Sequence, residues 1–300
     1  MKKMIFRNVL IASVGLAASG GGGSASAKQA VAAAPAAPVV APPLMPTPAI
    51  PTGGVPTGWK LAWSDEFDVD GLPNPAKWNF DTDHNKNGWY NNEKQYYSRD
   101  RLKNARVSNG KLAITAFREK LSSAVDYGGQ SYTSARLLTK GKAEWTYGFY
   151  EIRAKLPCGL GTWPAIWMLG KAGDWPLKGE IDIMEHVGKK QGEVLGTVHT
   201  GAYNHTIGTQ KGSATTVPDA CDVFHNYQLR WEEDQIVIGV DDKYYFQFVN
   251  PKDGDARKWP FSAPEHLLLN LAIGGDLGGP VDDAIFPVKM EVDYVRVYQR

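Results

Sequence analysis

Three acidic residues within a stretch of nine, residues 179–187, are the side chains of this sequence best suited to catalysis. The stretch reads Gly-Glu-Ile-Asp-Ile-Met-Glu-His-Val. In a β-strand, successive side chains alternate between the two faces, which places Glu180 and Asp182 on one face. Strict alternation would bury Glu185 on the other face, and an unpaired buried carboxylate is costly. We therefore expect a β-bulge near Ile183–Met184 that returns Glu185 to the acidic face.

Alternating acidic and apolar residues are also typical of any half-solvated strand, so the pattern alone does not define a site. Two features favour chemistry. Three like charges on one short face repel each other, which stability alone would not select. Trp163, Trp167 and Trp175 lie just upstream and could stack on sugar rings. Paired carboxylates beside aromatic side chains are the groups that cleave a glycosidic bond, and crowding them raises the pKa of at least one.

The overall charge makes nucleic acid or an anionic membrane an unfavoured partner. The chain has 300 residues, with 33 basic and 32 acidic side chains, a net charge of +1 and no basic tract. It is rich in Trp (10) and Tyr (13), and Gly (32) and Pro (19) occur throughout. This composition favours a β-rich fold with many turns.

The N-terminus predicts export. Lys2, Lys3 and Arg7 precede an apolar run too short to span a bilayer, and Ala25-Ser26-Ala27 fits a cleavage site. We expect a signal peptide at 1–27 and an extended Ala/Pro-rich linker at 28–56. One catalytic domain then remains, at 57–300. The mature protein is expected to be secreted or periplasmic and not bound to a membrane.

Period-2 alternation recurs along the domain and long helical periodicity is absent, which predicts two antiparallel sheets packed face to face. Residues 290–298 are apolar on both faces in our interpretation, and hence form a central strand. Several other strands carry polar and aromatic residues on the face away from the core, so one sheet could line an open groove. The clearest alternating segments are 111–118, 149–156, 227–231, 236–240 and 266–273.

The domain contains two cysteines, Cys158 and Cys221. In an exported protein they could form one disulfide between two loops, and two buried free thiols are the alternative. Neither has a neighbouring cysteine or a matching histidine pattern, so a metal or nucleophilic role is weakly supported.

Five ordered motifs resemble glycoside hydrolase family 16, specifically its laminarinase-like endo-β-1,3-glucanases, over residues 59–300. They are Trp-Ser-Asp-Glu-Phe-Asp at 63–68, Tyr-Gly-Phe-Tyr-Glu-Ile-Arg-Ala-Lys-Leu-Pro at 147–157, Gly-Thr-Trp-Pro-Ala-Ile-Trp-Met-Leu at 161–169, Glu-x-Asp-x-x-Glu at 180–185 and Val-Asp-Tyr-Val-Arg-Val at 292–297. The resemblance implies an all-β jelly-roll sandwich of two curved antiparallel sheets with a concave substrate cleft. The six-residue bulged form of the acidic motif is typical of laminarinase-like members, and the five-residue form of lichenases and xyloglucan-active relatives.

The resemblance also implies roles for individual residues. Glu180 would be the nucleophile of a retaining mechanism, Glu185 the general acid/base, and Asp182 an electrostatic aid. Trp163 resembles a sugar-stacking position, whereas core packing is an equal alternative for Trp167. Six further positions resemble polar residues that line the cleft: Asn92, Glu93, Arg136, His199, His205 and Asn270.

Family members commonly carry a structural calcium ion away from the cleft, and none is needed for catalysis. The matching positions are Glu66, Gly110 through its carbonyl oxygen, and Asp293. Oxygen ligands from separate strands suit this hard cation.

Together these observations predict a monomeric, secreted endo-glycosidase that cleaves internal β-1,3 bonds of laminarin-like β-glucans with retention. The same mechanism on mixed-linkage β-glucan, agarose or carrageenan is an alternative, although the balanced charge disfavours a sulfated polymer. A non-catalytic glucan-binding module is a second alternative, which the presence of all three acidic residues disfavours.

Overall fold

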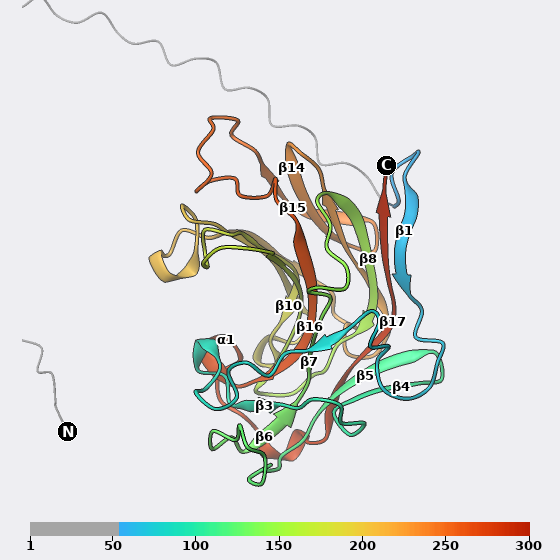
Figure 1. Cartoon of the computed structure of the whole chain (residues 1–300), viewed down its shortest axis with the longest axis vertical. Coiled ribbons are helices and arrows are strands. Elements are labelled where there is room, and N and C mark those ends of the chain that lie inside the picture. The colour runs from blue at the N-terminus through green and yellow to red at the C-terminus, as the bar shows by residue number, and fades with distance from the viewer. Residues whose placement is uncertain (1–53) are drawn as a thin grey trace, which may run out of the picture. The chain divides into compact units, whose positions relative to one another are not determined.

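A computed structural model describes residues 54–300, whose regular structure is almost entirely β-strand (Figure 1). The predicted signal peptide 1–27 and all but the end of the predicted linker 28–56 lie outside these residues. Two large antiparallel sheets pack face to face, which confirms the predicted all-β jelly-roll sandwich. Within this described part, no helix has the length and hydropathy needed to cross a bilayer.

The sheet that we call the outer sheet has eight strands among the described residues. Strand β1 pairs with one edge of β17, and the remaining strands follow the order β15-β14-β13-β8-β17-β5-β4. Their bounds are β1 Lys60–Asp65, β4 Ala105–Ser108, β5 Lys111–Ala116, β8 Gly148–Lys155, β13 His225–Trp231, β14 Gln235–Val240, β15 Lys243–Val249 and β17 Val288–Gln299.

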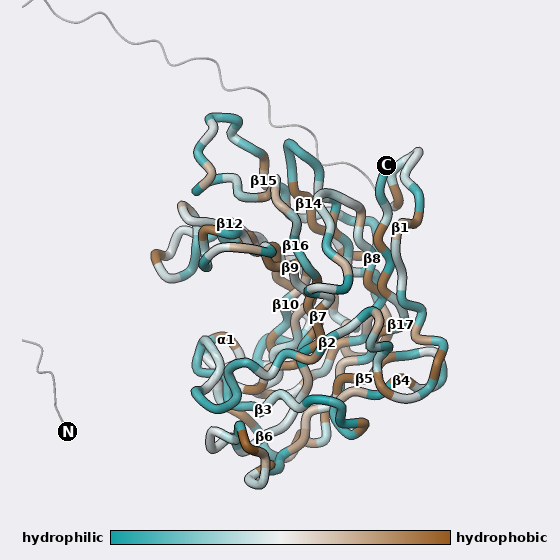
Figure 2. Tube along the Cα trace, viewed as in Figure 1, coloured by the Kyte–Doolittle hydropathy of each residue, from teal (hydrophilic) through white to brown (hydrophobic). Residues whose placement is uncertain are grey.

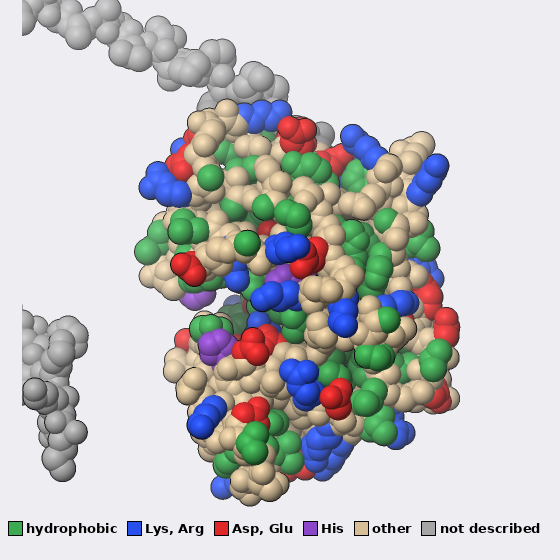
Figure 3. Space-filling model, viewed as in Figure 1, with side chains coloured by type: hydrophobic (Ala, Val, Ile, Leu, Met, Phe, Trp, Pro, Cys, Tyr) green, Lys and Arg blue, Asp and Glu red, His purple; other side chains and the backbone are tan. Residues whose placement is uncertain are grey.

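The inner sheet has seven strands in the described chain, in the order β12-β11-β10-β9-β16-β7-β2. It curves around a hollow that is visible at the left of the space-filling view, with histidine side chains on both sides (Figure 3). Its strands are β2 Asn79–Phe80, β7 Arg136–Leu138, β9 Thr162–Gly170, β10 Glu180–His186, β11 Glu193–His199, β12 Lys211–Thr216 and β16 Glu265–Ile273.

The remaining elements are short and lie in connections. Strands β3 and β6 form a small parallel pair, and the helical segments have three or four residues each. The bounds are β3 Gln95–Tyr97, β6 Tyr132–Ser134, α1 Gly275–Gly278, and the 3-10 turns η1 Tyr90–Asn92, η2 Gly188–Lys190, η3 His205–Ile207 and η4 Asp283–Ile285.

One continuous apolar core lies between the two sheets. The alternation predicted for 111–118 is observed, since the buried and half-buried residues of β5 alternate strictly. Hydrophobic residues are concentrated in the strands and hydrophilic ones in the peripheral loops (Figure 2). Ile152 of the outer sheet and Ile166 and Ile181 of the inner sheet belong to the same buried cluster. Each of these side chains contributes about 1.5–3 kcal/mol by leaving water.

The prediction for 290–298 was right in position and wrong in pattern. Strand β17 lies inside the outer sheet between β8 and β5, as a central strand should. Only one of its faces is buried, however, since Val292, Val295 and Val297 are fully buried while Glu291 and Arg296 are half-buried. A register shift between Val292 and Tyr294 breaks the alternation and obscures the pattern in the sequence.

Cys158 and Cys221 are joined in the structure, with their Cα atoms 5.7 Å apart and a sequence separation of 63. The bond links the loop after β8 to the loop before β13. Closing a loop of that length restricts the unfolded chain, an effect of roughly 4 kcal/mol in the chain-entropy account.

Candidate active site

Strand β10 contains the predicted bulge. Its register against β9 shifts between Asp182 and Met184, and its register against β11 shifts between Asp182 and Glu185. Ile183 and Met184 are consequently both fully buried in the core. The extra residue returns Glu185 to the face that carries Asp182, as the cost of burying an unpaired carboxylate led us to expect.

A glycine fixes the point at which the chain enters this strand. Gly179 has a φ of +83°, a conformation that few other residues adopt readily. A Cβ atom at Gly179 would also lie 3.0 Å from the carboxyl Oε1 of Glu265 and 3.0 Å from Cγ of Pro260. Only glycine therefore fits directly before Glu180 without displacing its surroundings.

Each of the two predicted catalytic glutamates accepts a hydrogen bond from an indole. Nε1 of Trp175 donates to Oε2 of Glu180 at 2.8 Å, and Nε1 of Trp163 donates to Oε1 of Glu185 at 3.0 Å. Both bonds favour the ionised form of the glutamate that accepts them. Trp163 is only 9% exposed, so its observed contact is this hydrogen bond, and its predicted stacking on a sugar ring stays a prediction.

The middle carboxylate lies against a histidine. Nε2 of His199 is 3.3 Å from Oδ2 of Asp182 and 3.9 Å from Oε1 of Glu180. His199 reaches this position because it pairs with Glu180 across β10 and β11. The ring of His205 lies 5.2 Å from that of His199 and 5.0 Å from that of Trp175. Both predicted histidines therefore lie in one aromatic group beside Glu180.

Burial dominates the electrostatics of the three acids. Desolvation, reinforced by the charge of Asp182, raises the pKa of Glu180 to about 8. Desolvation and then the charge of Glu185 raise the pKa of Asp182 well above its usual range. Desolvation also raises the pKa of Glu185, against the Trp163 hydrogen bond. The group therefore retains protons near neutral pH, and a proton on Asp182 removes the main charge repulsion acting on Glu180.

A second polar network covers the inner sheet on the other side of β9. Nε1 of Trp167 donates to Oδ1 of Asn270 at 2.8 Å, and the guanidinium carbon of Arg136 lies 4.7 Å from the Trp167 ring centre. Asp81 holds Arg136 through a 3.0 Å ion pair. Trp167 thus packs on the cleft face and not in the core, which decides the alternative left open by the sequence.

The same network extends to Glu93. Nδ2 of Asn270 donates to the hydroxyl of Tyr97 at 3.0 Å, and that hydroxyl donates to Oε2 of Glu93 at 3.2 Å. Gln95 donates to the same oxygen at 2.8 Å. Burial raises the pKa of Glu93, against the positive charge of Arg136. Glu93 is thus a fixed member of this network and not a solvated loop carboxylate.

Asn92 is at the margin of this arrangement. Its side chain donates to Oδ1 of Asp276 in α1 at 2.7 Å, and both residues are in the exposed part of their loops. The predicted cleft residues therefore fall into three groups around the acids. Those beside Glu180 are His199 and His205, those across β9 are Arg136, Trp167, Asn270 and Glu93, and Asn92 lies at the rim.

A small hollow of about 120 Å³ continues the inner face beyond Arg136. Leu169 of β9 and His266 and Leu268 of β16 line it on the same strand faces that carry Trp167 and Asn270. The inner sheet therefore offers a continuous set of polar and apolar contacts on one side of the acid group, as an extended ligand would require.

The predicted calcium positions lie together on the outer sheet, away from the acids. The end of β1 pairs with β17 at Val295, and the pairing of β17 with β5 begins at Val292. The ends of β1 and β5 therefore meet beside the segment between them. Glu66, Gly110 and Asp293 are at this junction.

Both carboxylates at the junction already have positively charged partners. Arg296 donates to Glu66 at 2.8 and 3.0 Å and lowers its pKa, and Arg153 forms a 2.6 Å ion pair with Asp293. The oxygen donors suit calcium, but the ion would have to displace both guanidinium groups. Calcium binding here stays a prediction.

Sequence reasoning missed several residues of the site. Trp175 was noticed only as a nearby aromatic residue, although it lies five positions before Glu180 and next to Pro176, a spacing that suggests a loop folding back. Tyr97 and Asp81 had no signal, because their partners Asn270 and Arg136 are distant in sequence.

The fold and the site together define a carbohydrate-cleaving enzyme, with two glutamates and an aspartate on the concave face of a jelly roll. Residues 92–296 match the sequence profile of "Glycosyl hydrolases family 16". The chain therefore belongs to glycoside hydrolase family 16.

Relatives agree with this assignment. The chain is 52% identical over 252 residues to a "Beta-glucanase" of Rhodothermus marinus, a match that covers 80% of this chain and 85% of the relative. Among solved structures, SCLam, "a non-specific endo-beta-1,3(4)-glucanase from family GH16", matches with a TM-score of 0.82 and 54% identity, covering 83% of this chain and 94% of that one. The "laminarinase from Rhodothermus marinus" matches with a TM-score of 0.76 and 52% identity, covering 80% and 97%.

Proposed function

We propose that this enzyme cleaves internal β-1,3-glucosidic bonds of laminarin-like β-glucans, with retention of anomeric configuration. The observation that carries the proposal is the bulged strand, which presents Glu180, Asp182 and Glu185 on one face with an indole donor on each glutamate. Relatives described as β-glucanase and laminarinase support the substrate class.

In the first step, ionised Glu180 attacks the anomeric carbon while protonated Glu185 donates to the departing glycosidic oxygen. The Trp175 N–H holds the Glu180 carboxylate in place. Asp182 keeps its proton and so removes a repelling charge beside Glu180. The products of this step are a glycosyl-enzyme ester and a free sugar end.

In the second step, Glu185 acts as a base. Having lost its proton, it accepts one from water, and the water oxygen attacks the anomeric carbon and releases Glu180. Two displacements on the same carbon give net retention. The Trp163 N–H stabilises Glu185 during the part of the cycle in which it is ionised.

Mixed-linkage β-glucan is the second candidate substrate. SCLam, which is 54% identical to this chain, is described as non-specific for β-1,3(4)-glucans. Initial rates and products of the purified enzyme on laminarin, lichenan, agarose and carrageenan test both candidates, with Glu180→Ala as the blank. We expect laminarin to be cut fastest, with a mixture of internal fragments first. Intact laminarin alongside cleaved agarose would overturn the substrate assignment.

The indole hydrogen bonds predict that the two tryptophan variants shift different limbs of the pH–rate profile. Trp175→Phe removes the indole N–H that donates to Glu180 and should therefore raise the pKa of Glu180. The acidic limb of the kcat/KM profile then moves to higher pH. Trp163→Phe removes the indole N–H that donates to Glu185 and should therefore raise the pKa of Glu185. The alkaline limb of the profile then moves to higher pH. Initial rates across a pH series measure both limbs.

Trp167→Phe is the matched control, because its indole donates to Asn270 and not to an acid. It should lower the rate without moving either limb. If Trp175→Phe moved the alkaline limb and Trp163→Phe the acidic limb, the proposed roles of Glu180 and Glu185 would be exchanged.

We retain the proposal that calcium stabilises the junction of β1, β5 and β17. A chelator should then lower the melting temperature, since an ion that binds only the folded state stabilises it, and leave the initial rate at low temperature unchanged. The ligand atoms of Glu180, Asp182 and His199 also lie within 4.8 Å of one another. Immediate loss of activity without a change in stability would instead indicate a metal ion at these three residues.

We also propose that the protein is exported and acts as a monomer. The basic and apolar N-terminal residues and the Ala25-Ser26-Ala27 pattern support export. N-terminal sequencing of protein from the culture medium and periplasm should find a mature start near Lys28, and an intact Met1 in both would contradict it.

A further inference from the structure

The short helix α1, which follows β16, lies against Trp163, the residue whose indole donates to Glu185. Trp163 forms a small apolar cluster with Val187 and Ala272, separate from the main core. Ala272 pairs with Trp163 across β16 and β9, and Val187 comes two residues after Glu185. Leu277 of α1 packs on this cluster and is itself half-buried. Leu277 therefore covers the group of side chains that holds the indole donor of Glu185.

The backbone of α1 also approaches the indole ring closely. A Cβ atom at Gly275 would lie 3.3 Å from Cζ3 of Trp163 and 2.8 Å from the carbonyl oxygen of Asn91. Gly275 has a φ of +78°, a conformation that other residues rarely adopt. At the far end of α1, a Cβ atom at Gly278 would lie 3.4 Å from Cβ of Trp163. Both ends of α1 thus lie against Trp163 and restrict the movement of its ring.

The turn η1 holds α1 in this place. Glu93, directly after η1, forms a backbone bridge with Gly274, directly before α1. Nδ2 of Asn92 donates to Oδ1 of Asp276 at 2.7 Å and so joins the side chains of the two segments. Both of these residues are exposed, so their hydrogen bond can be removed without leaving a cavity in the core.

We infer that α1 positions the general acid/base, with Leu277 and Asp276 as the positioning residues. Leu277 keeps the Trp163 indole directed at Glu185. The hydrogen bond from Asn92 to Asp276 keeps α1 against the ring. This inference rests on the proposed role of Glu185, and it gives Asn92 a contact with α1 in place of the sugar contact that the family resemblance implies.

The ionisable groups that face Glu185 lie on elements other than α1. They are Asp182 on β10, His199 on β11, Glu93 before β3 and Tyr245 on β15. Helix α1 therefore acts on Glu185 through Trp163. A weaker hydrogen bond from Trp163 raises the pKa of Glu185, whereas loss of a nearby negative charge would lower it, so the two causes differ in sign.

The pH–rate profile of Leu277→Ala tests the inference. This variant keeps the indole and every charge but loosens the packing of Trp163, so the hydrogen bond to Glu185 weakens and the pKa of Glu185 rises. We expect the alkaline limb of kcat/KM to move to higher pH, by less than in Trp163→Phe, and kcat/KM at the optimum to fall about two- to tenfold. In the Trp163→Phe background, Leu277→Ala should move the limb no further, because that hydrogen bond is already absent.

Variants of Asp276 separate positioning from charge. Asp276→Ala removes the acceptor of the Asn92 hydrogen bond and should move the alkaline limb to higher pH. Asp276→Asn keeps an acceptor oxygen for Asn92 and should leave the limb in place. A limb that moved to lower pH in both variants would report the loss of a charge, and a higher KM with unmoved limbs would report a lost sugar contact. Either result would overturn the positioning role of Asp276.

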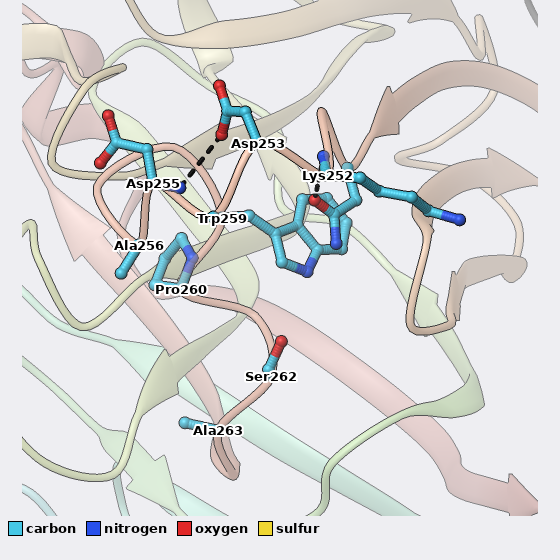
Figure 4. Close-up of a pocket in the computed structure, with 10 residues that line it drawn as sticks. Lys252, Asp253, Asp255, Ala256, Trp259, Pro260, Ser262 and Ala263 are labelled. Carbon is cyan, nitrogen blue, oxygen red and sulfur yellow. Dashed lines mark hydrogen bonds between the residues drawn. The ribbon is translucent and has the colours of Figure 1, made fainter.

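Asp253→Ala is the matched control. Asp253 is also an exposed loop aspartate with a partner, Lys258 at 2.5 Å. It lies in the connection before β16, beside a hollow of about 580 Å³ (Figure 4), whereas α1 follows the other end of that strand. Asp253→Ala should therefore leave both limbs unchanged.

The indole N–H resonance of Trp163 gives a readout that does not require activity. In a proton–nitrogen correlation spectrum, it is the indole signal that is missing from Trp163→Phe. We expect this signal to move in Leu277→Ala, because its hydrogen bond to Glu185 is weakened. An unmoved signal together with an unmoved alkaline limb in Leu277→Ala would overturn the inference and leave the proposed function intact. If Trp163→Phe itself moved no limb, the proposed role of Glu185 and this inference would both fail.

Discussion

Replacing Glu180 with alanine is expected to lower kcat by several orders of magnitude on every substrate. In the proposed mechanism no glycosyl-enzyme can form without this carboxylate, and activated leaving groups do not bypass that requirement. Added azide should occupy the vacated space and invert the anomeric carbon once, giving an α-glycosyl azide. Rates on laminarin and on an activated aryl β-glucoside, with product analysis by NMR, measure these effects.

Two controls accompany this variant. Glu233→Ala removes an exposed glutamate whose side chain makes no hydrogen bond or ion pair within the described residues, and it should behave as the unsubstituted enzyme. Asp182→Asn mimics the protonated aspartic acid that burial favours, so its loss should be smaller than that of Glu180→Ala. Turnover of Glu180→Ala near that of the unsubstituted enzyme would refute the mechanism.

Replacing Glu185 with alanine is expected to separate two kinds of substrate. Hydrolysis of laminarin should fall by several orders of magnitude, because its leaving oxygen needs a proton. Formation of the glycosyl-enzyme from an activated aryl β-glucoside should be largely spared, because that leaving group departs as an anion. Azide should then attack the intermediate and yield a β-glycosyl azide, since two inversions give retention.

A burst of released phenol, followed by slow turnover, is the kinetic sign to look for in Glu185→Ala. Equal losses on laminarin and on the aryl glucoside would argue against its role as the acid. Azide products with their anomers exchanged between the two variants would reverse the assignment of Glu180 and Glu185.

The bulge in β10 could be predicted from sequence because a single physical cost determined it. Strict alternation would have buried Glu185, and an inserted residue avoids this without losing Ile183 or Met184 from the core. The alternating faces of β5 and the antiparallel sandwich could also be predicted from the sequence, because a period-2 pattern of apolar residues reports burial directly.

The hydrogen-bond partners of the acids could not be predicted from the sequence in the same way. Trp175 reaches Glu180 only because the connection between β9 and β10 folds back, and the spacing before Glu180 suggests such a turn without showing which side chain it brings to the acid. Tyr97 links Glu93 to Asn270 from a short strand outside both large sheets. The polar face of β17 was misjudged because its register shift hides the alternation.

The family resemblance and the structure point to different roles for Trp163. The resemblance predicts stacking on sugar, whereas the structure gives Trp163 a hydrogen bond to Glu185 and buries most of its surface. The indole therefore has a role that its residue type alone did not indicate. The pH–rate profile of Trp163→Phe examines that role separately from substrate affinity.

We propose above that Glu180 and Glu185 cleave β-1,3-glucan by double displacement. The most direct measurement is the anomeric configuration of the newly formed reducing end, followed by proton NMR during the first minutes of laminarin hydrolysis. We predict that the β-anomer appears first and that the α-anomer follows only by mutarotation. Initial appearance of the α-anomer would show a single inversion and would contradict the mechanism.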